Sequence, residues 1–234
     1  MIFVLMLVLK KENYKKMGID MHKIIYKYGT MFSGKSLDLI STIKAYENNG
    51  YETLILKPKV STRDGDVIKS RLSTVTLPCI LLDKEDSIKR IFKNKLNNEY
   101  EFSSLIVIDE VQFCTEDQIE ELKSLSTFAT IICYGLMLTS YNIVFPSINK
   151  LLTIADDIEE IKSLCQCPKC TRKATHNLLL IYNTPMYTDE AYKDINVSLD
   201  DYDNKAVKYK AVCREHYIDP HKIIEYEQSI DEGA

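Results

Sequence analysis

Residues 29–36 read Gly29-Thr30-Met31-Phe32-Ser33-Gly34-Lys35-Ser36 and match the pattern G-x-x-x-x-G-K-[ST]. A β-prone run at residues 22–28 precedes them, and residues 36–49 follow with apolar side chains at helical spacing. A strand, this loop and a helix in that order are the context in which the pattern forms a phosphate-binding loop. The chain has only 7 glycines in 234 residues, so it is informative that two of them bracket this octapeptide.

The residue types of this loop suit a nucleoside triphosphate. The two glycines permit a concave backbone whose N–H groups point at phosphate oxygens, and the helix that follows adds its positive N-terminal end. Lys35 supplies a cation for the β- and γ-phosphates, and Ser36 offers a hydroxyl ligand to Mg²⁺. We therefore expect ATP and Mg²⁺ as ligands. The nucleotide-binding candidates are Gly29, Thr30, Met31, Phe32, Ser33, Gly34, Lys35 and Ser36.

A pair of carboxylates follows a second apolar run. Asp109-Glu110 directly follows the apolar residues 105–108, which places two acidic groups at the carboxyl edge of the expected sheet, beside the phosphate loop. Asp109 would hold Mg²⁺, directly or through water, and Glu110 would orient or deprotonate a nucleophile. The run Asp109-Glu110-Val111-Gln112 is also similar to the Asp-Glu motif of helicases. A helicase motor needs a second RecA-like domain, however, and this chain has no room for one.

Short apolar runs alternate with helical patterns over the first two thirds of the chain. Strands are expected at 22–28, 53–57, 105–108 and 130–134, and helices at 36–49, 87–96 and 116–124. Thr115 begins a capping box, T-E-D-Q, which marks the start of the last of these helices. This order predicts an α/β fold, namely a P-loop RecA-like parallel sheet with helices on both faces.

Cysteines and one histidine in the last third have the spacing of metal ligands. Cys167-x-x-Cys170 is one chelating pair and Cys213-x-x-His216 is a second, and together they suit a tetrahedral structural Zn²⁺ site. Cys165 could replace Cys167 with a modest loop adjustment. A redox C-x-x-C motif is the alternative, but it needs no second pair. We expect a small zinc-binding lobe with a long loop, residues 183–208, between the two pairs.

Composition and the chain ends set further limits. With 45% hydrophobic and 27% charged residues and a net charge of −4, the composition is that of a globular protein. We expect neither a nucleic acid nor a membrane as a partner. Residues 1–20 lack a signal-peptide pattern, and we expect them to be an extension upstream of the native start. Without a secretory signal, a reducing, cytoplasmic location is expected. The expected domains are 21–155, which binds nucleotide, and 156–234, which binds zinc.

The combined motifs resemble those of the type II thymidine kinases, a zinc-containing family. Residues 31–36 look like the phosphate loop of that family, and Asp109-Glu110-Val111-Gln112-Phe113 looks like its D-E-x-Q-F motif. The resemblance covers residues 23–218. Further matching stretches are Leu56-Lys57-Pro58, Thr62-Arg63-Asp64, Ser70-Arg71, Cys133-Tyr134-Gly135-Leu136, Ala155-Asp156, Glu160-Ile161-Lys162, Lys173-Ala174-Thr175 and Val212-Cys213-Arg214-Glu215-His216-Tyr217.

The resemblance implies phosphoryl transfer from ATP to the 5′-hydroxyl of thymidine or, as a second substrate, deoxyuridine. It implies that Glu110 is the general base, that Asp109 and Ser36 hold Mg²⁺, and that Lys35 and Arg63 neutralise phosphate charge. It also implies that Gln112 belongs to the same nucleotide site. For the nucleoside, the resemblance places Phe113 on the base, Met31 near its 5-methyl group, and Tyr209 at a lasso-like loop that closes over it. Such kinases are commonly homotetramers that the end product inhibits.

Two segments depart from the family pattern. Residues 137–142 read Met-Leu-Thr-Ser-Tyr-Asn, so an aromatic wall of the nucleoside pocket is absent or shifted to Tyr141. Asp203-Asn204-Lys205 stands where the family has Ile-Gly-Gly, and side chains there should reshape the backbone contact with the base. Three interpretations therefore stay open: a thymidine kinase with a rebuilt lasso, a nucleoside kinase with another base preference, and a nucleotide-binding paralogue that phosphorylates poorly. We favour the first.

Overall fold

The computed structural model of the chain describes residues 22–60, 65–71, 74–95, 104–182, 184–185 and 207–220. Three predictions lie outside these residues: the N-terminal extension 1–20, the phosphate contact of Arg63, and most of the expected long loop 183–208 with its altered stretch Asp203–Lys205. None of the helices within the described ranges is long and apolar enough to cross a membrane.

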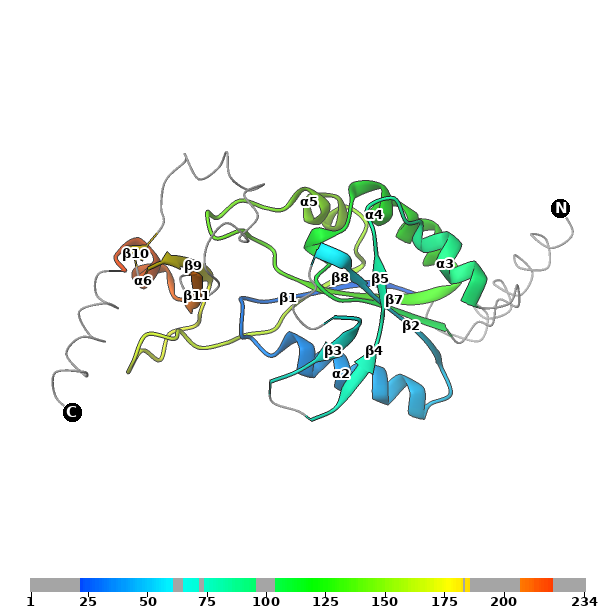
Figure 1. Cartoon of the computed structure of the whole chain (residues 1–234), viewed down its shortest axis with the longest axis horizontal. Coiled ribbons are helices and arrows are strands. Elements are labelled where there is room, and N and C mark those ends of the chain that lie inside the picture. The colour runs from blue at the N-terminus through cyan, green and yellow to red at the C-terminus, as the bar shows by residue number, and fades with distance from the viewer. Residues whose placement is uncertain are drawn as a thin grey trace, which may run out of the picture.

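The central element is a sheet of six parallel strands in the order β5-β2-β6-β7-β1-β8 (Figure 1). Its middle strands are short apolar runs that are buried on both faces, as parallel sheets covered by helices require. The strands are β1 (Ile24–Tyr28), β2 (Glu52–Pro58), β5 (Ile80–Leu82), β6 (Ser104–Ile108), β7 (Ala129–Gly135) and β8 (Asp157–Glu160).

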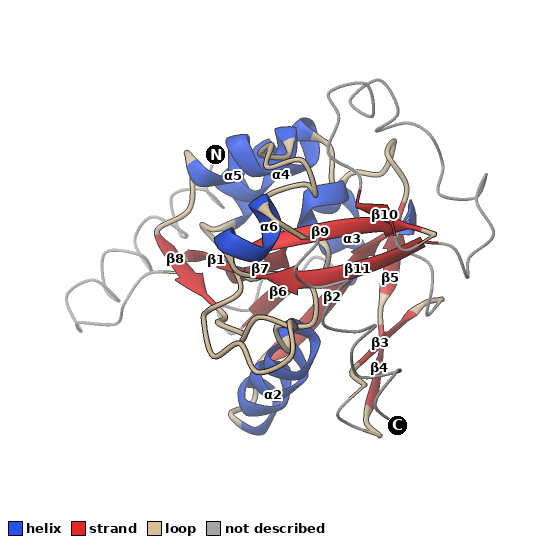
Figure 2. Cartoon of the chain, turned by 90° about the vertical axis from the view of Figure 1, so that its left-hand side faces the viewer, coloured by secondary structure: helices blue, strands red, loops and turns tan. Residues whose placement is uncertain are grey.

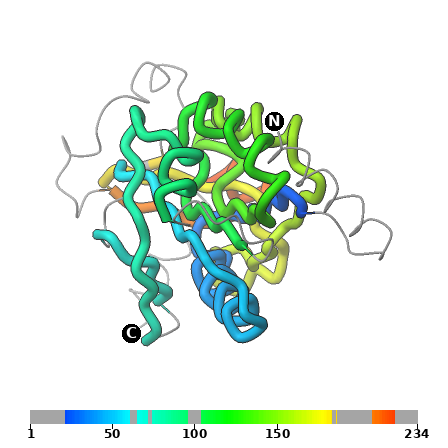
Figure 3. Tube along the Cα trace, turned by 90° about the vertical axis from the view of Figure 1, so that its right-hand side faces the viewer, coloured from blue at the N-terminus to red at the C-terminus, as the bar shows by residue number. Residues whose placement is uncertain are grey.

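Two hydrophobic layers lie on opposite faces of this sheet (Figures 1 and 3). One face packs against α3 (Ile88–Lys95), α4 (Glu116–Leu125) and α5 (Pro146–Leu152), which contribute apolar side chains such as Phe92, Leu122 and Leu151 to one core cluster. The other face packs against α2 (Lys35–Asn48), through Leu39 and Ile43. The predicted α/β fold, with a parallel sheet and helices on both faces, is confirmed.

Two features differ from the sequence-based expectation. The polar composition of residues 58–69 predicts a loop after β2, but β3 (Val67–Lys69) pairs with β4 (Thr76–Pro78) in an antiparallel hairpin beside α2. The expected domain boundary at residues 155/156 also falls before β8, which is a strand of the main sheet. The Asp156 carboxylate accepts a 2.8 Å hydrogen bond from the Ile24 backbone N–H, and β8 then pairs with β1. The sheet therefore extends to Glu160.

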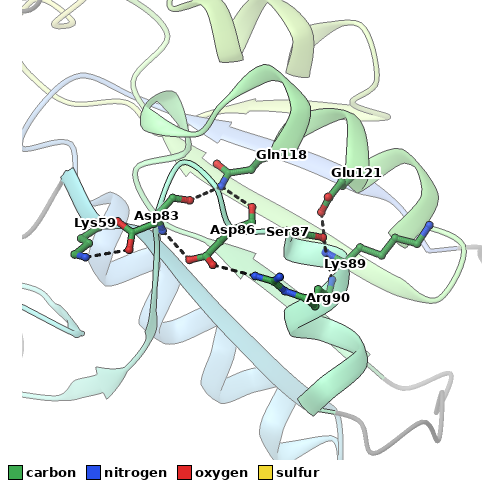
Figure 4. Close-up of polar contacts among 8 residues, drawn as sticks. All are labelled: Lys59, Asp83, Asp86, Ser87, Lys89, Arg90, Gln118 and Glu121. Atoms are coloured by element: carbon green, nitrogen blue, oxygen red, sulfur yellow. Dashed lines mark hydrogen bonds and ion pairs between the residues drawn. The ribbon is translucent and has the colours of Figure 1, made fainter.

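A buried glutamine ties the start of α4 to the loop before α3 (Figure 4). The expected capping box is present, with Thr115 and Gln118 each accepting a hydrogen bond from the backbone of the other. The Gln118 amide also donates to the backbone carbonyls of Asp83 and Asp86, at 2.8 and 3.0 Å. Gln118 therefore satisfies polar backbone groups in the scaffold, on the face of the sheet that α3 and α4 cover.

A small lobe follows the main sheet. It holds a three-stranded antiparallel sheet in the order β10-β9-β11, with a short helix, α6, beside it (Figure 2). Leu178, Leu180 and Val212 form its small core together with buried cysteines. The elements are β9 (His176–Ile181), β10 (Thr184–Pro185), β11 (Val207–Val212) and α6 (Arg214–Ile218).

Candidate active site

The phosphate loop connects β1 to α2 at the carboxyl edge of the sheet. Gly34 caps α2 with φ of +90°, a left-handed conformation that glycine adopts without steric cost. Phe32 also has a positive φ, of 63°, and its exposed ring lies under the guanidinium of Arg71, 5.0 Å from the ring centroid. The loop therefore has the left-handed turns that curve a backbone around an anion.

The charge and hydrogen-bonding state of this loop suit a phosphate ligand. The Lys35 ammonium is buried and donates to the backbone carbonyl of Thr30 at 2.8 Å. Burial lowers the pKa of Lys35, while the nearby carboxylates of Glu110 and Asp109 oppose that shift. The Ser33 hydroxyl is buried and has no hydrogen-bond partner among the described residues. A bound phosphate group would neutralise the Lys35 ammonium and accept a hydrogen bond from the Ser33 hydroxyl, so both groups suit this ligand.

The two acidic residues follow β6, as predicted. Asp109 is buried, and its backbone N–H donates to the Leu56 carbonyl at 2.9 Å. Burial and the neighbouring charge of Glu110 raise the pKa of Asp109 to about 7, against the opposing charges of Lys57 and Lys35. A bound cation would favour the ionised carboxylate, so this position suits a metal ligand. Glu110 is only half-buried and has a φ of +51°.

Gln112 contacts the carboxylate of Glu110. It lies in a short helix, η2 (Val111–Phe113), that begins directly after Glu110. Its side-chain amide donates to the Glu110 carboxylate and accepts a 3.0 Å hydrogen bond from the Leu136 backbone N–H. The sequence placed Gln112 among the nucleotide-binding residues, and the described contacts of its side chain are to Glu110 and to the end of β7.

The residues expected to contact a nucleoside come from three elements. Met31 lies in the phosphate loop and is half-buried. Phe113, in η2, is exposed and stacks edge-on against Phe145 with ring centroids 6.1 Å apart. Tyr209 lies on β11, opposite Leu179 of β9. Arg63, expected near the phosphates, lies outside the described residues.

In the described part of the chain, several polar contacts join the small lobe to the rest of the molecule, and sequence analysis missed three that span long stretches of sequence. Asn177 accepts a 2.8 Å hydrogen bond from the Met31 backbone N–H. The hydroxyls of Ser163 and Thr30 lie 2.8 Å apart. The Tyr217 hydroxyl donates at 2.7 Å to the carbonyl of Ser140, inside the segment that departs from the family pattern. No local pattern could reveal these contacts, because the partners are separated by 77 to 146 residues.

A group of metal-binding side chains lies in the small lobe. The ligand atoms of Cys165, Cys170, Cys213 and His216 all lie within 4.8 Å of one another. The His216 Nδ1 is 3.3 Å from the Cys165 sulfur and 3.4 Å from the Cys213 sulfur. Three thiols and one imidazole are a donor set that Zn²⁺ takes in structural sites. The residues present therefore fit a structural zinc ion.

This group includes Cys165 where the predicted set has Cys167. The backbone carbonyl of Cys167 accepts a 3.1 Å hydrogen bond from the Cys170 N–H, which closes the tight turn between them. Its side chain is buried in the core of the lobe. The Cys165 N–H pairs with the Arg172 carbonyl, at 2.8 Å, on the other side of that turn. Both thiols are therefore near the turn, but it is the Cys165 sulfur that lies with the other three ligand atoms.

The chain is similar in sequence to known thymidine kinases. The thymidine kinase family matches residues 22–217. A thymidine kinase of Streptococcus gordonii is 32% identical over 203 residues, covering 86% of this chain and 98% of that protein. A thymidine kinase of Francisella tularensis subsp. holarctica is 30% identical over 203 residues, covering 84% and 97%. The genome packaging NTPase B204 from Sulfolobus turreted icosahedral virus 2, solved in complex with sulfate, covers 59% of this chain and 73% of its own, with 15% identity and a TM-score of 0.37, too low to bear on the fold. With the family match spanning most of its length, the chain belongs to the thymidine kinase family.

Proposed function

We propose that this chain phosphorylates thymidine, transferring the γ-phosphoryl group of ATP to the 5′-hydroxyl and releasing thymidine 5′-monophosphate and ADP. One observation supports this above the rest. In a member of the thymidine kinase family, the buried ammonium of Lys35 interacts with the carboxylates of both Asp109 and Glu110 at the phosphate loop. Phosphoryl transfer needs such a combination of cation, metal-binding carboxylate and base.

Each of these side chains has a distinct task in the proposed reaction. The phosphate-loop backbone and Lys35 bind the triphosphate, and the Ser33 hydroxyl is available to a phosphate oxygen. Ser36 and Asp109 would hold Mg²⁺, which neutralises charge on the phosphate oxygens when bound. Glu110 accepts the proton of the 5′-hydroxyl while that oxygen forms its bond to the γ-phosphorus. The bond between the γ-phosphorus and the bridging oxygen breaks, and ADP leaves with that electron pair.

The nucleoside would lie between the main sheet and the small lobe. Met31 and Phe113 come from the main-sheet side and Tyr209 from β11, in agreement with the nucleoside contacts that the family resemblance implies. The hydrogen bond from Met31 to Asn177 supports this placement, because it connects the phosphate loop directly to β9, the strand beside β11. Rejection of other bases would then depend on polar groups that thymine alone satisfies.

Other features of the family complete the proposal. A structural Zn²⁺ would be held by Cys170, Cys213 and His216, with a fourth thiol from Cys165 or Cys167. It would tie the turn after the main sheet to the end of β11. By the same resemblance we propose a cytoplasmic homotetramer.

A panel of nucleosides with ATP and Mg²⁺, scored by 5′-monophosphate formation, tests the proposed reaction. We expect thymidine to be phosphorylated with the highest kcat/KM and deoxyuridine with a lower value. A higher kcat/KM for a nucleoside with another base would contradict the proposed specificity. ATP binding without phosphorylation of any nucleoside would contradict the proposed reaction itself.

A further inference from the structure

We propose that Gln112 is a positioning residue, which holds the Glu110 carboxylate in its working orientation through a hydrogen bond and does not itself bind the nucleotide. The proposal rests on the proposed function, in which Glu110 is the general base. A base must lie within hydrogen-bond reach of the proton that it removes, so a residue that fixes its carboxylate controls the rate of the chemical step.

The Gln112 side chain is fixed at both ends of its amide. Its Nε2 donates to the Oε2 of Glu110, and its Oε1 accepts from the Leu136 backbone N–H at 3.0 Å. Its own backbone carbonyl accepts a 2.8 Å hydrogen bond from the buried hydroxyl of Ser147, on α5. Gln112 is only 4% exposed, so these contacts are shielded from competing water. Gln112 therefore links Glu110 to the end of β7 through its side-chain amide and is itself held to α5 through its backbone carbonyl.

The chain leaves room for this amide at one glycine. A Cβ added to Gly135 would lie 2.5 Å from the Oε1 of Gln112 and 3.0 Å from the Cγ1 of Val111. The φ of Gly135 is not in the left-handed region, so its backbone conformation does not require glycine. The close approach of the Gln112 amide is what requires it, and this accounts for one glycine in a chain that has few.

Glu110 needs such an anchor because other groups act on the same carboxylate. It is half-buried, and its left-handed backbone is at the start of η2, where the chain turns away from β6. The Lys35 ammonium attracts it and the Asp109 carboxylate repels it. Without the amide of Gln112, the attraction of Lys35 would draw the Glu110 side chain toward the phosphate site and away from the nucleoside hydroxyl.

The test compares two buried glutamines that differ in what their amides hold. In Gln112→Glu, the new carboxylate can still accept from the Leu136 N–H, but it replaces the donor to Glu110 with a repelling charge.

Gln118→Glu is the matched control. Gln118 is also 4% exposed, and among the described residues its amide donates to the backbone carbonyls of Asp83 and Asp86, which belong to the scaffold (Figure 4). We expect kcat to fall at least about tenfold in Gln112→Glu, with the KM for ATP within about threefold of wild type. Gln118→Glu should lower thermal stability and keep kcat.

A double-mutant cycle shows whether Gln112 acts through Glu110. In a Glu110→Gln background there is no base to position, so adding Gln112→Glu should change kcat by less than about twofold. Gly135→Ala provides a second route if Gln112→Glu does not fold. The new methyl group meets the far end of the Gln112 side chain, so the variant should fold and lose kcat in the same way.

The outcomes separate this proposal from the proposed function. A wild-type chain that makes no thymidine monophosphate would refute the proposed function and, with it, the positioning role. An active wild type in which Gln112→Glu keeps kcat would overturn the positioning role alone. So would a Gln118→Glu variant with an equal loss of kcat, or an undiminished effect of Gln112→Glu in the Glu110→Gln background.

Discussion

The backbone N–H of Met31 donates a 2.8 Å hydrogen bond to the side-chain Oδ1 of Asn177, across 146 residues of sequence. This contact joins the phosphate loop to β9 of the small lobe. Asn177 is buried, so the hydrogen bond is largely protected from water. The shape of the nucleotide site therefore depends on a lobe that contributes no residue to the phosphate-loop motif.

Replacing Asn177 with alanine should loosen the phosphate loop. The Met31 N–H would lose its partner, which costs about 1 kcal/mol, and the loop would no longer be held in one conformation. We expect the KM for ATP to rise several-fold and kcat to fall less, measured by steady-state kinetics with ATP as the varied substrate. Ser163→Ala is the milder comparison, because it removes one hydroxyl contact with Thr30 and leaves the loop backbone bonded. Equal kinetics in wild type and Asn177→Ala would show that the lobe does not support the loop.

Replacing Glu110 with glutamine should abolish most catalysis while leaving nucleotide binding intact. The amide is nearly the same size as the carboxylate and still offers an oxygen to the Gln112 donor, but it cannot take up the proton of the nucleoside hydroxyl. We expect kcat to fall by a factor of about 10²–10⁴, with ATP affinity near that of wild type in a binding assay. Glu116→Gln is the control, since it removes an exposed carboxylate at the first turn of α4. An unchanged kcat in Glu110→Gln would exclude Glu110 as the base.

The sequence predicted those parts of the molecule that local patterns encode. The phosphate loop, the Asp109-Glu110 pair after its strand and the capping box at Thr115 are short motifs whose geometry follows from neighbouring residues. The contact between Met31 and Asn177, and the anchoring of Glu110 by Gln112 against the end of β7, depend on tertiary packing that no local spacing shows. The metal ligands lie between these two cases, because their spacing predicted part of the set and the folding of a turn decides the rest. The C-x-x-C spacing indicated Cys167, whereas the turn closed by the Cys167 carbonyl leaves the Cys165 sulfur beside His216.

A histidine in the small lobe should give the stability a pH dependence. Burial, and next the charge of Arg214, lower the pKa of His176, whose ring stacks on Tyr217 with centroids 4.6 Å apart. A histidine whose folded-state pKa lies below its unfolded value of 6.5 contributes stability above that pH, and this is lost as the pH falls through the folded-state pKa. His176→Phe keeps an aromatic ring for the stack and removes the titration.

The free energy of unfolding of His176→Phe relative to wild type therefore should rise as the pH is lowered from about 7.5 to about 5. Urea unfolding of both proteins, as purified with their metal, measures this difference at each pH. Protonation of other groups affects both proteins alike, so it cancels in the comparison. A difference that stays constant across this range would show that His176 titrates equally in the folded and unfolded chains.

The two neighbouring cysteines should differ in their importance for zinc. The Cys165 sulfur lies within 4.8 Å of the ligand atoms of Cys170, Cys213 and His216, so Cys165→Ser removes a thiolate from the donor set, and serine is a poor substitute for it. Cys167→Ser should leave that set complete and cost only packing in the small core.

We expect about one zinc per chain in wild type and in Cys167→Ser by metal analysis, and a clear loss in Cys165→Ser. Cys165→Ser should also release its metal to a chelator faster. Cys79→Ser, which lies between β4 and β5 and outside the metal-binding group, controls for the loss of a thiol as such. The reverse result, with zinc lost from Cys167→Ser and kept in Cys165→Ser, would assign the site to the C-x-x-C pair that the spacing predicts. Zinc-free protein that is folded and active would exclude a structural metal altogether.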